Sequence, residues 1–302
     1  MEFRSFTEIE DFIVSGGIRK KIVLCGADDE AALEAVVNAK RAGVADGLLL
    51  GDEQGIRSLL HRMEEASEGY EILDMPGEKE ASEAAVAFMR EGRADIEMKG
   101  KMPSTEYLLP IMHPIDGLLP GDALLSEVTV FYYPDQNRLM FATDCALNIS
   151  PTLKEKEKLI RNAADLAGIF GFEKVKVAVI SALESVNPAI PSTLEARDLA
   201  SMDWGENIIV AGPFALDNAL DEATARDKGI TNEVAGRADI LLMPDICAGN
   251  VFHKCIHYFG HIQNASIAYG TSKPIVFTSR SDSAEQKYFS ILTAILQSYK
   301  SS

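Results

Sequence analysis

Hydrophobic and polar positions along the chain follow two alternating patterns. Short runs rich in Val, Ile and Leu are separated by longer segments in which apolar residues recur every three or four positions. The first pair is a strand at 21–25 and an alanine-rich helix at 29–41, with Gly26 at the sharp exit, Asp28 placed to cap and Gly43 closing the helix. Such alternation is typical of parallel strands joined by crossover helices.

The same pattern predicts two α/β layers. The first layer has further strands at 47–50, 70–73 and 94–98 and helices at 53–65 and 78–91. Prolines and glycines then interrupt the pattern between 103 and 134, and strands at 127–133 and 138–142 follow as a hairpin. The second layer has a helix at 153–169 and strands at 175–180, 207–210, 240–243, 266–269 and 274–277.

These layers predict an α/β protein of two domains with mainly parallel strands. A length of 302 residues lies near the size at which one hydrophobic core stops growing and chains divide. We place the boundary in the proline-rich break. The first domain then comprises residues 1–125 with 281–302, to which the last helix at 283–299 returns, and the second comprises 126–280.

Charge and cysteine content indicate which partners and which cell compartment are disfavoured. With 46 acidic and 29 basic residues the net charge is −17, which disfavours nucleic acid or an anionic membrane as a partner, so an anionic substrate needs local groups to hold it. No apolar run approaches the roughly 18 residues of a membrane span, and residues 1–15 lack the profile of a signal peptide. The cysteines lie in or beside apolar runs, which predicts buried thiols and a cytoplasmic protein: Cys25, Cys145, Cys247 and Cys255.

Polar residues follow the expected strands in order. In open parallel sheets ligands bind beyond the carboxyl ends of strands, so these residues are candidates for substrate binding. One polar exit is usually a helix cap, but six in succession suggest a cleft lined by loops. The candidates are Lys99 and Gly100, which open into Ser104 and Thr105; Thr143 and Asp144; Ser181 with Asn187; Gly212 and Pro213; Asp245 with Gly249 and Asn250; and Ser279 with Arg280.

The segment from Thr278 to Ser283 has the clearest chemistry. It combines hydroxyls, the guanidinium of Arg280 and a helix N-terminus, which together suit a tetrahedral oxyanion such as phosphate. The alternative is a serine-rich helix cap with a surface arginine. Lys99 beside Gly100 is a weaker anion site of the same kind.

Other chemistries find little support. No dinucleotide-binding, Walker or nucleophile-elbow motif occurs. His253, His257 and His261 stand four apart with Cys255 among them and could form a metal-binding stripe, the only support for a metal-dependent dehydrogenase. Gly260 breaks the helix before the last histidine and no carboxylate completes the set, so we predict no metal.

Six segments resemble, in order and spacing, the phosphate acetyltransferase and phosphate butyryltransferase family, and its butyryl branch more closely. They are residues 94–100, 142–151, 181–188, 212–218, 243–250 and 278–284. The resemblance covers nearly the whole chain. It implies two α/β/α domains like those of isocitrate and isopropylmalate dehydrogenases, with the active site in a cleft between them. It also implies acyl-CoA and inorganic phosphate as substrates, a homodimer or larger homo-oligomer, and no cofactor, coenzyme A being substrate or product.

The resemblance also assigns residues. Ser279 and Arg280 match the pair that contacts the thioester and the phosphate, whereas Asp144, Asn148 and Asn187 match motif positions without an individual role.

Two departures from the family pattern matter. Arginines usual at 109–110 and 116–122 are absent. The acetyl branch has an acidic residue at the position where this chain has Gln286, so a catalytic acid or base would have to be Asp282 or Glu285 instead.

The resulting hypothesis is direct displacement: Arg280 and Lys99 hold the phosphate, the phosphate attacks the thioester carbonyl, and CoA leaves. Three alternatives stay open: an acetyl or other acyl group; a protein that binds CoA or acyl phosphate as a sensor without turnover; and Cys145 as an acyl-carrying nucleophile, which its apolar neighbours disfavour.

Overall fold

A computed structural model describes residues 1–301 of the chain. Contacts between Cα atoms divide the chain into two compact units. Unit 1 comprises Met1–Ser5 and Ser126–Gln263, and unit 2 comprises Phe6–Leu125 and Asn264–Ser302. Each unit combines a sheet with helices, which confirms the predicted α/β class.

Unit 2 contains a sheet with the strand order β3-β2-β1-β4-β11-β10. All neighbours in it are parallel except β10 and β11, which are antiparallel. Its strands are β1 (Lys20–Cys25), β2 (Ala45–Gly51), β3 (Glu71–Asp74), β4 (Ile96–Lys99), β10 (Asn264–Tyr269) and β11 (Ile275–Val276). Its α-helices are α1 (Phe6–Ser15), α2 (Glu30–Arg41), α3 (Glu53–Arg62), α4 (Glu78–Arg90), α5 (Ser104–Ile111) and α11 (Ala284–Lys300).

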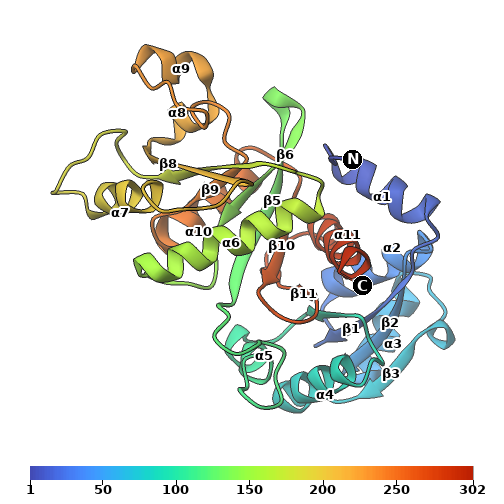
Figure 1. The fold of residues 1–302 in the computed structure, drawn as a ribbon. Helices are drawn as coiled ribbons and strands as arrows, with labels where there is room; N and C mark the ends of the chain where they lie inside the picture. The colour runs from blue at the N-terminus through green and yellow to red at the C-terminus, as the bar shows by residue number, and fades with distance from the viewer. Residues whose placement is uncertain (302) are drawn as a thin grey trace. The chain divides into compact units, whose positions relative to one another are not determined.

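The direction of chain winding reverses in unit 2 between β1 and β4. From β1 the chain moves outward through β2 to β3, and then returns to the other side of β1 through α4 and β4. Accordingly α1, α2 and α11 lie on one face of this sheet and α4 and α5 on the other (Figure 1). The carboxyl ends of β1 and β4, where Cys25 and Lys99 are in register, therefore form a topological switch point, the usual ligand position in such sheets.

Unit 1 contains a sheet with the strand order β5-β6-β9-β7-β8. The first two strands form the predicted antiparallel hairpin, and the others are parallel. Its strands are β5 (Ser126–Tyr133), β6 (Arg138–Thr143), β7 (Val175–Ile180), β8 (Ile208–Phe214) and β9 (Ile240–Leu242). Its α-helices are α6 (Leu153–Ile169), α7 (Pro191–Ala200), α8 (Leu216–Leu220), α9 (Glu222–Asp227) and α10 (Ile246–Tyr258).

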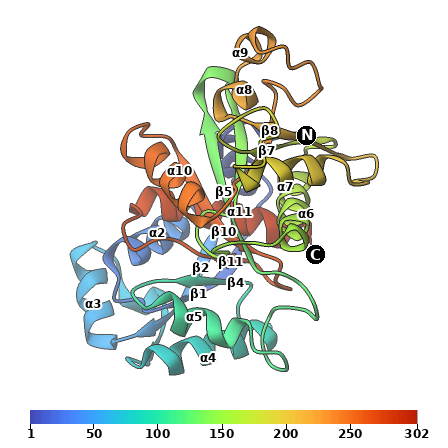
Figure 2. The ribbon, with the colours of Figure 1, turned by 90° about the vertical axis from the view of Figure 1, so that its left-hand side faces the viewer.

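Alternate residues of β6 serve the two faces of this sheet. Met140 belongs to a buried cluster with Ile256 of α10. Its neighbour Phe141 points the other way, and its ring packs edge-on against Phe170 and Phe172 at the end of α6. In Figure 2, α6 and α10 accordingly lie on opposite sides of the sheet.

The two units differ from the predicted domains where the chain returns to the first domain: unit 2 resumes at Asn264, whereas the prediction placed this return at residue 281. The strands expected at 266–269 and 274–277 were assigned to the second domain, but β11 pairs with β4 and β10 pairs with β11, so both belong to unit 2. A short apolar run does not encode which sheet it joins, which explains the difference. Similarly, Met1–Ser5 joins unit 1, where the amide of Phe3 donates to the carbonyl of Phe170 (3.0 Å).

Cysteine exposure also differs from expectation. Cys25 and Cys145 are buried as predicted, but Cys247 and Cys255 are exposed on α10, so the expectation of four buried thiols is wrong for two of them. The neighbouring Ile256 is buried in the core of unit 1, so an apolar neighbour in the sequence does not place a cysteine on the buried side of the helix. Over the described part of the chain, no helix has the length and apolar character needed to cross a bilayer.

Candidate active site

The segment from Ser279 to Ser283 forms a structured turn at the start of α11. The amide of Ser279 donates to the carboxylate of Asp282 (2.7 Å), which is buried. Ser283 is the N-cap of α11 and exchanges hydrogen bonds with Gln286, its hydroxyl accepting from the Gln286 amide (3.2 Å). Ser283 thus serves the helix cap, and the acetyl-branch acid position is filled by a capping glutamine. Ser283 therefore has the capping role of the alternative interpretation, and Arg280 is exposed in the same turn, where it can still meet an anion.

Lys287 lies beneath this turn and was missed by the sequence analysis. Its side chain is 1% exposed, and its ammonium donates to the hydroxyl of Thr278 (3.1 Å) and to the carbonyl of Ser279 (2.8 Å). The ammonium therefore fixes the backbone that carries Arg280. A signal for it exists in the sequence, because a lysine here falls within the apolar stripe of the last helix.

Lys99 adds a second buried cation in unit 2. It ends β4 and is 2% exposed. Burial, followed by the nearby positive charges of Lys287 and Arg280, lowers the pKa of Lys99 to about 8, and the carboxylates of Asp29 and Asp282 oppose this shift. A buried ammonium with two cationic neighbours is a site where an anion is electrostatically favoured.

A cavity of about 320 Å³ opens at the switch point of unit 2. It is lined by residues at or just after the carboxyl ends of β1, β2, β3 and β4, among them Gly26, Gly51 and Lys101, and by the exposed Arg280. The glycines allow the loops after β1 and β4 to approach, since a Cβ on Gly100 would lie 2.3 Å from the carbonyl oxygen of Gly26. Gly100, a candidate for substrate binding, thus has a packing role. Three further candidates, Ser104, Thr105 and Glu285, are exposed on the first turns of α5 and α11 and do not line this cavity.

In unit 1, Asp144 organises the loop that follows β6. Its carboxylate is buried and accepts four hydrogen bonds from groups of the loop and of β5. These donors are the amides of Glu127 (2.9 Å), Ala146 (2.8 Å) and Leu147 (2.8 Å) and the side-chain amide of Asn148 (2.7 Å). The neighbouring Thr143 hydroxyl donates to the carbonyl of Glu127 (2.9 Å), and the Thr143–Asp144 peptide is cis. Thr143, Asp144 and Asn148 therefore shape this loop.

A polar network continues from this loop to α10. Glu127 accepts from the amide of Cys145 (3.2 Å) and from the hydroxyl of Thr129 (2.7 Å), which also contacts Nδ1 of the buried His253 (3.0 Å). Because the threonine proton points to Glu127, Nδ1 of His253 is the donor in the last contact. His261 lies beyond the end of α10, with a positive φ of 48°. Within residues 1–301, no group of three His, Cys, Asp or Glu side chains is arranged to hold a metal ion.

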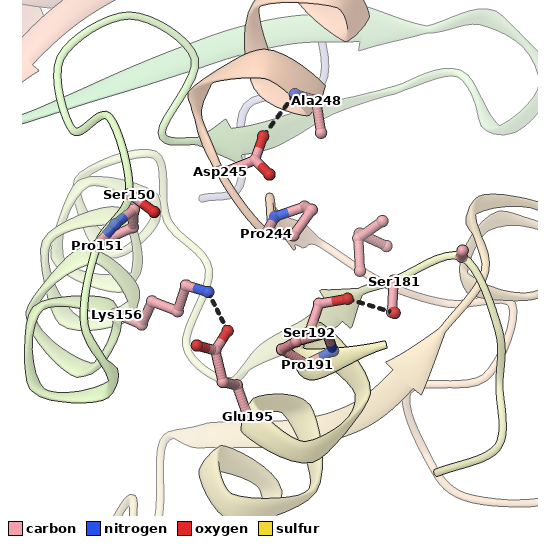
Figure 3. A pocket seen from close by; sticks show the side chains of 12 residues that line it. Ser150, Pro151, Lys156, Ser181, Pro191, Ser192, Glu195, Pro244, Asp245 and Ala248 are labelled. Atoms are coloured by element: carbon pink, nitrogen blue, oxygen red, sulfur yellow. Dashed lines mark hydrogen bonds and ion pairs between the residues drawn. The ribbon is translucent and has the colours of Figure 1, made fainter. Parts of the chain in front are cut away.

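A pocket of about 560 Å³ in unit 1 lies at the carboxyl ends of β7 and β9 (Figure 3). Two candidates line it: Ser181, whose hydroxyl contacts that of Ser192 (2.7 Å), and Asp245, which caps α10 by accepting from the amide of Ala248 (2.9 Å). Its wall also contains an ion pair between Lys156 and Glu195, which was not predicted from the sequence. Lys156 also falls within an apolar helical stripe, that of α6.

The remaining candidates have structural roles in unit 1. Asn187 closes a turn by accepting from the amide of Ala189 (3.0 Å). Gly212 and Pro213, joined by a cis peptide, lie within β8 and not after it, so the expected strand end at 210 is wrong. Gly249 packs against the Asp144 loop, where a Cβ would lie 2.2 Å from the carbonyl oxygen of Asp144. Asn250 donates to the carbonyl of Cys145 (3.3 Å).

Unit 2 thus combines a mostly parallel α/β fold with a serine–arginine turn and two buried lysines. The sequence profile described as phosphate acetyl/butaryl transferase matches residues 75–295, so the chain belongs to this family of acyltransferases. Phosphate butyryltransferase of Clostridium acetobutylicum is 42% identical over 296 residues, which cover 97% of this chain and 98% of that protein. Phosphate acetyltransferase of Thermotoga maritima is 38% identical over 278 residues, or 91% of this chain and 94% of that protein. The chain is thus a phosphate butyryltransferase-like acyltransferase.

The fold agrees with this placement. The crystal structure of a branched-chain phosphotransacylase from Enterococcus faecalis superposes with a TM-score of 0.84 at 27% identity, covering 93% of this chain and 99% of that one. A phosphotransacetylase from Streptococcus pyogenes, at 23% identity and a TM-score of 0.78, shares the fold over 98% of both chains.

Proposed function

We propose that this protein transfers a short-chain acyl group, butyryl or similar, between coenzyme A and inorganic phosphate, by direct displacement while both substrates are bound. The observation that carries the proposal is the Ser279–Arg280 turn held over Lys287 and close to Lys99 in unit 2. The family placement supplies the reaction class, and the relatives include both butyryl- and acetyltransferases.

Electrostatics favour phosphate at this turn. The chain has a net charge of −17, so a phosphate dianion is repelled by the molecule as a whole and needs a local cluster of cations. Arg280 is exposed and can offer two parallel N–H groups to phosphate oxygens, whereas the buried Lys99 acts as a point charge behind them. In this proposal Lys287 is a positioning residue, because its ammonium is already engaged by Thr278 and Ser279.

The proposed reaction is a single acyl transfer. A phosphate oxygen attacks the thioester carbonyl carbon, a carbon–oxygen bond forms, and the carbon–sulfur bond breaks with its electron pair leaving on the CoA thiolate. Holding both reactants together supplies much of the acceleration, and each well-placed donor to the developing oxyanion adds roughly 3 kcal/mol. The Ser279 hydroxyl is the candidate donor.

The thiolate requires only a weak acid, because a thiol has a pKa of about 8.5. Asp282 and Glu285 are the two carboxyl candidates for this role. Asp282 is buried and accepts from the Ser279 amide, whereas Glu285 is exposed. We favour Asp282 because it is in contact with the serine that the proposal places at the thioester.

An acyl-enzyme on Cys145 is disfavoured. Burial, followed by the carboxylates of Glu127 and Asp144, raises the pKa of this thiol well above its usual value. Since the thiolate is the nucleophilic form, such a cysteine is a poor acyl acceptor.

Several sequence expectations stay predictions within this proposal. They are the cleft between the two domains, the homodimeric or larger assembly, the cytoplasmic location, and the binding of substrate by Ser181, Asp245 and the other candidates. The pocket of unit 1 that Ser181 and Asp245 line is the feature that supports a role for these two residues.

The direct test follows thiol release from butyryl-CoA with a chromogenic thiol reagent, with and without phosphate. We expect phosphate-dependent release, and faster release from butyryl-CoA than from acetyl-CoA. Fastest release from acetyl-CoA would assign the acetyl activity. Binding of CoA in calorimetry without phosphate-dependent release from any short-chain acyl-CoA would instead identify a sensor and reject the proposed activity.

A variant tests the role of Arg280. Arg280→Ala should raise the KM for phosphate at least about 10-fold, the loss of one charge-assisted contact, and change the KM for acyl-CoA far less. The matched control is Arg237→Ala, which removes an exposed arginine paired with Glu222 in unit 1 and should change neither constant. Equal rises in both constants for Arg280→Ala would contradict its assignment to phosphate.

A further inference from the structure

The cavity at the switch point of unit 2 has walls of two kinds. Its rim carries four charged residues, Arg280, Lys101, Asp28 and Glu78. The ammonium of Lys101 lies 3.6 Å from the carboxylate of Asp28, so these two charges offset each other. The rest of the wall consists of apolar side chains and glycines. A molecule in this cavity therefore meets charge at the opening and an apolar surface inside.

Ala81 and Met102 form the buried part of the apolar wall, here called the cavity floor. Both residues line the cavity although each is only 1% exposed. Met102 is positioned by the turn after β4, in which the amide of Lys101 donates to the carbonyl of Gly26 (3.0 Å) and the amide of Met102 donates to that of Gly100 (3.0 Å). This turn leaves Lys101 exposed and Met102 buried. The sizes of two side chains therefore set the depth of the cavity.

The volume of the cavity suits a short-chain acyl phosphate. Its 320 Å³ corresponds to roughly ten water molecules at about 30 Å³ each. Butyryl phosphate has about ten non-hydrogen atoms, and atoms joined by covalent bonds occupy less space than separate waters, so a molecule of this size fits. Coenzyme A is several times larger and does not fit. The cavity is therefore matched to the acyl and phosphoryl groups of the reaction and not to the whole thioester.

We infer that the cavity floor receives the acyl chain while Arg280, on the rim, meets the phosphate, so that Ala81 and Met102 determine which chain lengths are accepted. The inference rests on the proposed acyl transfer and adds the part of the site that selects the acyl group. An alkyl chain on the cavity floor leaves water, and each buried methylene favours binding about 4-fold. The unbranched side chain of Met102 can adapt to the end of such a chain.

The same walls indicate which acyl groups the cavity excludes. An acyl group that ends in a carboxylate would place an unpaired negative charge on the apolar cavity floor, which is strongly unfavourable. Asp28 and Glu78 on the rim would add repulsion. We therefore expect kcat/KM for succinyl-CoA to be at least about 10-fold below that for butyryl-CoA.

The experiment measures kcat/KM for phosphate-dependent thiol release from acetyl-, butyryl-, hexanoyl- and succinyl-CoA. Ala81→Leu fills the cavity floor and should lower the ratio of butyryl-CoA to acetyl-CoA about 15-fold, the contribution of two methylenes. Ala84→Leu is the matched control, since it makes the same change on α4 at a half-buried residue that does not line the cavity. It should leave the ratio unchanged.

A second variant acts in the opposite direction. Met102→Ala deepens the cavity and should raise the ratio of hexanoyl-CoA to butyryl-CoA at least about 4-fold, the contribution of one methylene. It decides the question if Ala81→Leu proves poorly folded in circular dichroism.

Two kinds of failure can be told apart. Unchanged chain-length ratios in the folded variants, or succinyl-CoA used as well as butyryl-CoA, would overturn the inference and leave the proposed acyl transfer standing. If the unchanged protein shows no phosphate-dependent release from any acyl-CoA, the proposed function fails and the inference fails with it.

Discussion

Asp144→Asn is expected to destabilise unit 1 strongly although it preserves shape. One carboxylate oxygen accepts from the amides of Ala146 and Leu147, and the other accepts from the amide of Glu127 and the side-chain amide of Asn148. An asparagine can reproduce only one of these pairs, because its NH₂ group would point at two donors.

The loss can be worked from these contacts. Two buried donors lose their acceptor, and each such loss costs roughly 1–3 kcal/mol, so the free energy of unfolding should fall by about 2–6 kcal/mol. The assay is urea denaturation followed by the fluorescence of Trp204, the single tryptophan, which is buried in unit 1.

Asp245→Asn is the matched control. Asp245 caps α10 through a hydrogen bond from Ala248 and lies in the same unit. Asparagine caps helices about as well as aspartate, so this change should cost less than about 0.5 kcal/mol. Equal stability losses in the two variants would refute the idea that the Asp144 carboxylate holds its loop.

Two further predictions concern pH. Because the pKa of Lys99 is lowered to about 8, its charge is lost as pH rises through that value, so the KM for phosphate should increase between pH 7 and 9. Lys99→Arg should flatten this dependence, because an arginine stays charged. Parallel pH profiles of the two proteins in initial-rate assays would count against a phosphate contact. Glu97 is fully buried, and burial raises the pKa of its carboxyl well above the usual value. Its contribution to stability is therefore present below the unfolded pKa of about 4.3 and is lost as pH rises. In urea denaturation, Glu97→Gln should gain stability relative to the unchanged protein from pH 5 to pH 8, and a constant difference would show that Glu97 does not titrate in this way.

The sequence predicted the α/β class and the start of the last helix after the serine–arginine segment because both depend on local patterns. Alternating apolar runs mark strands and helices, and the hydroxyls of Ser279 and Ser283 precede a helix wherever it packs. Membership of β11 in the sheet of unit 2 was not predictable in this way, since pairing with β4 depends on residues far away in the chain.

The candidate site likewise has some features that local sequence patterns reveal and others that depend on distant parts of the chain. Lys287 and Lys156 are basic residues within apolar helical stripes, a local irregularity that sequence reasoning could have used. Gly249, in contrast, is predicted to belong to a binding loop, but it packs so closely that a side chain there would collide with the backbone at Asp144. Polar or small residues after strands thus indicate the carboxyl edge of the sheet, where ligands usually bind, but they do not distinguish ligand-binding residues from packing residues.

The chain order of the two units has a consequence for biosynthesis. Nearly all of unit 1 is one continuous stretch, Ser126–Gln263, whereas unit 2 is completed only by Asn264–Ser302. On a ribosome, which delivers residues from the N-terminus onward, the hairpin and helices of unit 1 are available for folding while β4 still lacks its neighbour β11. The last segment supplies both α11, which closes that core, and Arg280, so the cationic turn appears only when the nascent chain is nearly finished.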